Sequence, residues 1–106
     1  MGKKRSIPRS CVKYYTMASL NEFTDAGIAE KEEVKLLEKF VSKILELNGM
    51  KLLGWAKAKD RYIDVLTYYE IPFICVIETE EGQKVLADVS EDKINIITRE
   101  LLDSYF

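Results

Sequence analysis

Apolar residues between positions 28 and 48 recur with the spacing of one helix face. At about 100° per residue they fall within one half of the helical wheel, and charged residues take most of the other half. Asn48 and Gly49 follow, and both residue types tolerate the left-handed conformation that ends many helices. The pattern predicts a long helix over 28–48, whose apolar half contains Val34, Leu36, Leu37, Phe40, Val41, Ile44, Leu45 and Leu47.

The rest of the chain favours strands followed by a second helix. Short runs rich in β-branched and aromatic residues, separated by turn-forming residues, are typical of strands. Ser19 and Glu22 form a capping-box pattern, which predicts a short helical turn. Ser90 is a candidate N-cap for a C-terminal helix over 91–105, because apolar residues continue from there at helical spacing. The candidate strands are 11–18, 51–58, 61–69, 73–79 and 84–89.

These elements predict an α+β fold. We expect a mostly antiparallel sheet of four or five strands, with the 28–48 helix and the 91–105 helix packed on one face. Residues 1–9 are expected to form a flexible basic arm, and 10–106 a single domain of ordinary size.

Alternation along the strands sorts the side chains of the predicted sheet into two faces. If Glu81 and Gly82 form a two-residue turn, Glu78 lies opposite Val85 and Val76 lies opposite Ala87. One face is then mostly aliphatic and forms the core. The other is aromatic and could be a second core layer, a surface for a partner or a second copy, or a platform for nucleic-acid bases. The candidate partner-binding residues on this face are Tyr62, Asp64, Leu66, Tyr68, Phe73 and Asp88.

The charges of the chain are divided unevenly. The first seventeen residues carry five basic side chains and no acid, whereas the remaining eighty-nine carry eleven basic and eighteen acidic side chains, a net of −7. Such asymmetry indicates a partner. A basic arm favours phosphate, and an acidic body favours a basic protein. The candidate nucleic-acid contacts are Lys3, Lys4, Arg5 and Arg9.

Composition excludes several kinds of chemistry. The chain has no histidine, which excludes histidine-dependent triads and HExxH zinc sites. Its two cysteines, Cys11 and Cys75, are too few for a disulfide framework or a zinc site and are expected to be reduced in the cytoplasm. The acids Asp64, Glu78 and Asp88 fall on different faces of the predicted sheet, so no metal site is expected. The sequence indicates no catalytic residue and no cofactor.

The order of the predicted elements resembles that of the RelE/ParE type of small ribosome-targeting toxin. This resemblance would make a set of basic residues and a tyrosine candidates for cleaving RNA, because that chemistry needs cations at the scissile phosphate. Those toxins are typically basic, whereas the body of this chain carries −7. The candidate residues are Lys57, Lys59, Arg61, Arg99 and Tyr105.

Two functions follow as hypotheses. The first is a small non-enzymatic interaction protein, of the inhibitor or adaptor type, that binds a protein partner or itself through the aromatic sheet face. The alternative is a nucleic-acid-associated protein with a basic N-terminal arm, of which a RelE/ParE-like RNase is one form.

The alternative makes a direct prediction. If the arm contacts phosphate, RNA or DNA binding should weaken steeply with added salt and disappear when residues 1–9 are removed, because each contact releases bound counterions. Gel shifts at several salt concentrations measure both effects. An unchanged shift after truncation would exclude the arm as the nucleic-acid contact.

Overall fold

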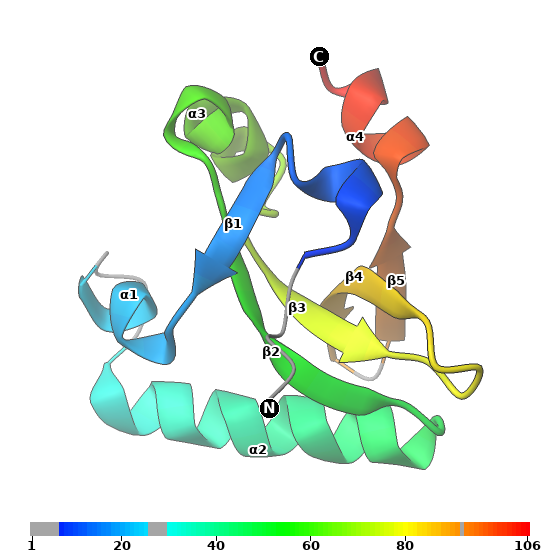
Figure 1. Cartoon of the computed structure of the whole chain (residues 1–106). Helices are drawn as coiled ribbons and strands as arrows, with labels where there is room; N and C mark the ends of the chain where they lie inside the picture. Colours follow the sequence, from blue (N-terminus) through cyan, green and yellow to red (C-terminus); the bar gives the residue numbers. More distant parts are fainter. Residues whose placement is uncertain (1–6, 26–29, 92) are drawn as a thin grey trace, which may run out of the picture.

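The computed structural model describes residues 7–25, 30–91 and 93–106 and consists of a five-stranded antiparallel sheet with helices on both of its faces (Figure 1). The strands lie in the order β1-β2-β3-β4-β5, and every neighbouring pair is antiparallel. The predicted α+β fold with an antiparallel sheet is therefore confirmed. The elements are a 3₁₀ turn Arg9–Cys11, β1 Tyr15–Ala18, α1 Leu20–Asp25, α2 Lys31–Leu47, β2 Lys51–Ala58, α3 Asp60–Tyr68, β3 Phe73–Glu78, β4 Lys84–Ser90, β5 Lys93–Ile97 and α4 Arg99–Ser104.

The central strand β3 is buried on both faces. Ile74 and Val76 point into a cluster that includes α3, α4 and the N-terminal segment, whereas Cys75 and Ile77 point into a cluster with α2. We call these sides the α4 face and the α2 face. The prediction that the long helix and the C-terminal helix share one face was wrong. A continuous apolar strand needs cover on both sides, and the two helices supply it from opposite sides.

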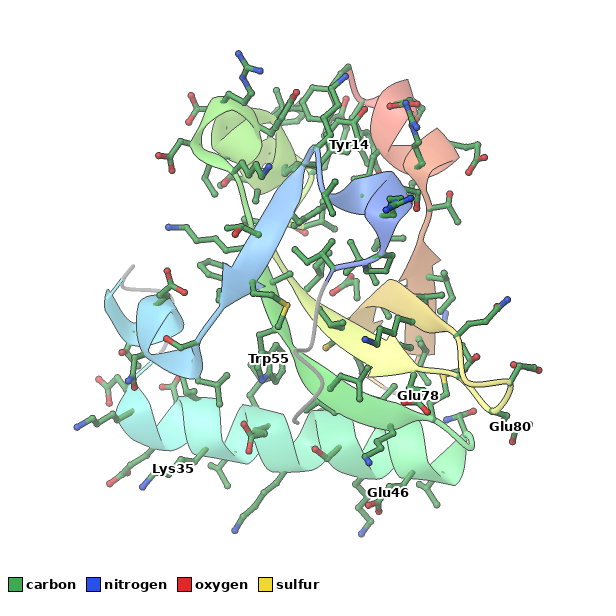
Figure 2. The ribbon with its side chains drawn as sticks, viewed as in Figure 1. Tyr14, Lys35, Glu46, Trp55, Glu78 and Glu80 are labelled. Atoms are coloured by element: carbon green, nitrogen blue, oxygen red, sulfur yellow. The ribbon has the colours of Figure 1, made fainter. Side chains whose placement is uncertain are left out.

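The long helix forms as predicted, within slightly narrower bounds. In α2, Val41 and Leu45 are buried against Trp55 and other residues of the α2 face. Figure 2 shows Trp55 pointing from β2 toward this helix, while Lys35 and Glu46 lie on its outer side. The amphipathic pattern therefore identified both the helix and its buried side.

Residues 60–68 form α3, and the strand predicted over 61–69 was wrong. Tyr62, Ile63 and Leu66 lie on the side of this helix that packs into the cluster of the α4 face. In a run of only nine residues the same apolar positions fit both an alternating and a helical pattern. Asp60 in the first turn favours the helix, because a negative charge there is stabilised by the helix dipole.

The C-terminal helix is shorter than predicted, because a strand occupies the first part of the 91–105 segment. The β-branched run of β5 pairs with β4, with Ser90 opposite Lys93 and Leu86 opposite Ile97. The N-cap of α4 is Thr98, whose hydroxyl accepts a hydrogen bond from the backbone N–H of Leu101 at 3.2 Å. Ser90 is the last residue of β4 and caps no helix.

The β3–β4 connection is a three-residue loop and not the predicted two-residue turn. The Thr79 N–H donates to the Gln83 carbonyl at 2.9 Å, which leaves three residues between them. The last of these, Gly82, has φ +81°, the left-handed conformation of this hairpin type. The extra residue shifts the register by one and reverses which β4 side chains share a face with β3. The observed pairs are Cys75 with Ala87, Val76 with Leu86, Ile77 with Val85 and Glu78 with Lys84.

The segment just before β1 and the C-terminal end of the chain meet beside α3. The Tyr14 hydroxyl donates to the Asp103 carboxylate on α4, and its ring lies 5.0 Å from the Tyr62 ring and 5.3 Å from the Phe106 ring, measured between centroids. Ile7 is also buried in the cluster of the α4 face. The folded domain therefore begins before residue 10, and Ile7 is not part of a free arm.

The helices α2 and α3 end in the same motif with different residues at its left-handed position. After α3, Ile71 N–H donates to the Leu66 carbonyl, and Glu70 has φ +62°. The corresponding residue after α2 is Gly49, with φ +73°. A residue with a Cβ is strained in this conformation, and glycine is not.

We therefore expect Glu70→Gly to raise the free energy of unfolding by about 1 kcal/mol. The reverse control is Gly49→Ala, which should lower it, because the new Cβ is strained and would meet the Glu80 side chain. Urea unfolding measures both changes. A Glu70→Gly protein that is no more stable than the wild type would contradict this account of the helix end.

Candidate functional site

The strands β3 and β4 separate at one end of the sheet, and a cavity of about 430 Å³ lies there. Their pairing stops at Cys75 and Ala87, although β3 begins at Phe73 and β4 continues to Ser90. Beyond this point β3 pairs with β2, and β4 pairs with β5. We call the space the β3–β4 cavity. Its volume lies within the range of about 300–1,000 Å³ that is typical of ligand pockets.

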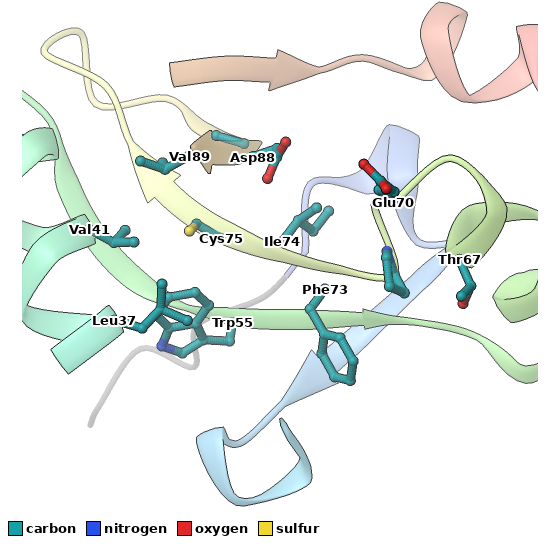
Figure 3. A pocket seen from close by; sticks show the side chains of 12 residues that line it. Leu37, Val41, Trp55, Thr67, Glu70, Phe73, Ile74, Cys75, Asp88 and Val89 are labelled. Carbon is teal, nitrogen blue, oxygen red and sulfur yellow. The ribbon is translucent and has the colours of Figure 1, made fainter. Parts of the chain in front are cut away.

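The β3–β4 cavity has an apolar part and an acidic part (Figure 3). The apolar part lies on the α2 face, where α2 and Trp55 form one wall. The acidic part lies toward the loop after α3, where Glu70 and Asp88 line the cavity together with Thr67. The remaining lining residues are Leu37, Val41, Pro72, Phe73, Ile74, Cys75, Ala87 and Val89.

Asp88 is a half-buried carboxylate, and burial raises its pKa above the usual value for aspartate. Within residues 7–25, 30–91 and 93–106, no side chain or backbone group forms an ion pair or hydrogen bond with it. Removing a carboxylate from water without a partner is unfavourable. The acidic part of the cavity therefore presents an uncompensated negative charge.

Neither cysteine is suited to nucleophilic chemistry. Cys75 lines the cavity, but burial and the charge of Asp88 raise its pKa to about 12, so it is a neutral thiol near pH 7. Burial also raises the pKa of Cys11. Among the described residues no group of three or more potential metal ligands comes together.

An exposed apolar stripe lies on α2 beside the cavity. Leu36, Phe40 and Leu47 are 66%, 47% and 77% exposed. At about 100° per residue they fall within about 40° of one another on the helix. Phe40 lies three residues after Leu37, which lines the cavity, and residues at this spacing are neighbours on a helix surface. We call these three residues the α2 stripe, which borders the cavity wall at Phe40.

The structure divides the six partner-binding residues predicted from the sequence. Phe73 and Asp88 line the cavity. Tyr62 and Leu66 turn toward the α4 face, where Leu66 is fully buried, and Asp64 and Tyr68 are exposed on α3. The single aromatic sheet face does not exist, because residues 60–68 form a helix and the β4 register is shifted.

Outside β3 and β4, the cavity residues that the sequence did not predict come from α2, from Trp55 on β2, and from α3 and the loop after it. The amphipathic pattern of α2 marked Leu37 and Val41 only as core residues. Glu70 gave no signal, because its position depends on the helical path of 60–68. Of the candidate nucleic-acid contacts, Arg9 is exposed in the 3₁₀ turn, and Lys3, Lys4 and Arg5 lie outside the described residues.

Comparisons of the chain with protein-family models, with curated proteins and with solved structures gave no match. Within the described part of the chain, no helix combines the length and the apolar character needed to cross a membrane.

The state of Asp88 leads to a pH-dependent prediction. Because the pKa of Asp88 is raised in the folded protein, its ionised carboxylate lowers the free energy of unfolding. This destabilisation is fully present at neutral pH and is absent below the unfolded-state pKa of about 3.9. We expect Asp88→Asn to be more stable than the wild type at pH 7 and the difference to shrink as the pH falls through the pKa of the folded protein.

Urea unfolding at pH 7 and at pH 3.5 measures this dependence. Asp64→Asn, at an exposed position on α3, controls for the loss of one negative charge. A destabilised Asp88→Asn protein at pH 7 would mean that the carboxylate makes a favourable interaction.

Proposed function

We propose that the protein is a small non-enzymatic interaction protein, of the inhibitor or adaptor type, that binds a protein partner or a second copy of itself. The binding surface consists of the α2 stripe and the adjoining β3–β4 cavity. The observation that carries the proposal is the continuity of these two features. Three large apolar side chains stand exposed along α2, and the stripe meets the cavity wall where Phe40 neighbours Leu37. Protein interfaces typically combine a buried anchor in a pocket with an apolar surround.

Charge supports the same proposal. The chain beyond residue 17 carries a net charge of −7. A charge of this sign increases the rate at which a basic partner is encountered and disfavours acidic ones. The proposal includes no catalytic step, because the chain has no histidine and both thiols have raised pKa values.

We expect the double substitution Leu36→Ser and Phe40→Ser to weaken the complex or the dimer at least tenfold, because truncation of central apolar contacts costs about 1–4 kcal/mol of binding energy. Both side chains are exposed, so the variant should fold. Analytical ultracentrifugation measures self-association, and affinity capture from the native host compares the partners bound by variant and wild type.

Lys35→Ser and Lys39→Ser form the matched control, because these residues are exposed on the same helix outside the α2 stripe. A wild-type protein that stays monomeric, and captures the same proteins in the same amounts as the Leu36→Ser and Phe40→Ser variant, would refute the proposal.

A further inference from the structure

The two acids of the β3–β4 cavity come from separate parts of the chain. Glu70 belongs to the loop after α3, and Asp88 belongs to the end of β4. Figure 3 shows both side chains near Ile74, away from Trp55 and Leu37 at the apolar part. An occupant that fills the whole cavity would therefore meet apolar groups at one end and carboxylates at the other.

The charge of Asp88 restricts the occupant further. A purely apolar group would leave this half-buried carboxylate without a counter-charge and remove more of its water, which is unfavourable. An acidic group would be repelled by both carboxylates. A positively charged group would form an ion pair in a partly desolvated place, where such a pair is stronger than on an open surface.

We propose that the β3–β4 cavity binds a lysine or arginine side chain of the protein partner. The apolar stem of the side chain lies along the apolar part, and its charged end lies between Glu70 and Asp88. Lysine and arginine suit such a site, because both bury an apolar stem while keeping the charged end near polar groups. This inference rests on the proposed function, to which it adds the chemistry of the partner segment.

The cavity is larger than one side chain needs. At about 430 Å³ it can also hold an apolar neighbour of the basic residue. The partner segment is therefore expected to place a lysine or arginine next to an aromatic or aliphatic residue. The net charge of −7 beyond residue 17 favours the approach of such a segment.

The probes are three capped pentapeptides that differ at one position. They are acetyl-Gly-Phe-Lys-Phe-Gly-amide and the two peptides in which norleucine or glutamate replaces the lysine. Norleucine keeps an apolar stem and removes the charge. Trp55 is the one tryptophan of the chain and lines the cavity, so its fluorescence reports binding there. Changes in the backbone amide signal of Val89 in NMR spectra provide a second readout at the same place.

We expect the lysine peptide to bind at least ten times more tightly than the norleucine peptide, and the glutamate peptide to bind most weakly. The combined Glu70→Gln and Asp88→Asn substitutions should abolish the preference for lysine. The control pair Glu80→Gln and Glu81→Gln changes the net charge equally in the exposed hairpin loop at the other end of β3, and should preserve it. Urea unfolding establishes that both variants are folded, and the single Glu70→Gln variant should retain part of the preference.

Three outcomes would overturn the inference: equal binding of the lysine and norleucine peptides, an unchanged preference in the Glu70→Gln and Asp88→Asn variant, or no binding by any peptide. Each leaves the proposed function to be judged by the α2 stripe experiment. If the Leu36→Ser and Phe40→Ser variant loses its partner and the peptides also fail, the proposed interaction surface is supported. Only the inference that the cavity binds a basic side chain is then rejected.

Discussion

The rest of the structure depends on the burial of β3 from both sides. Ile74, Cys75, Val76 and Ile77 are each at most 2% exposed, and burying an aliphatic side chain of this size contributes about 1.5–3 kcal/mol. One helix cannot cover both faces. The chain therefore places α2 on one side, and on the other it places α3, α4 and the N-terminal segment. Antiparallel neighbours pair with β3 on both edges from Cys75 to Glu78, and β2 alone continues the pairing to Phe73.

The candidate site follows from how the neighbours of β3 are connected. β4 turns tightly into β5 and follows it, whereas β3 begins at a loop that comes from α3. The two strands therefore part beyond Cys75 and Ala87. Side chains of α2 line the opening on the α2 face, and the loop after α3 contributes the acid Glu70 to its acidic part. A site of mixed character thus arises where two faces of the sheet and two helices meet, without any motif that is continuous in sequence.

The sequence predicted the features that depend on local patterning. A period of 3.6 residues identified α2, and apolar runs identified β2, β3 and β4. The prediction failed where a short segment fits two patterns. Tyr62 and Leu66 belong to a helix that was predicted as a strand. Ile94, Ile96 and Ile97 belong to a strand that was predicted as part of a helix. Phe73 and Asp88 were predicted at a binding surface and line the cavity, but their neighbours there depend on helix placement and on one extra loop residue.

The contact between the segment before β1 and the C-terminal end has a consequence for how the two parts of the chain support each other. Tyr14 and Asp103 are 89 positions apart in sequence, so their contact closes a long loop of chain at an entropic cost. The strands β2 to β5 follow one another along the chain and can pair before it. The Tyr14, Tyr62 and Phe106 rings pack on one another, so the loss of any one ring removes contacts of the other two. Cys11 and Leu102 also cover the same face of β3, so a loss of packing at either end of the chain weakens the cover on which the central strand depends.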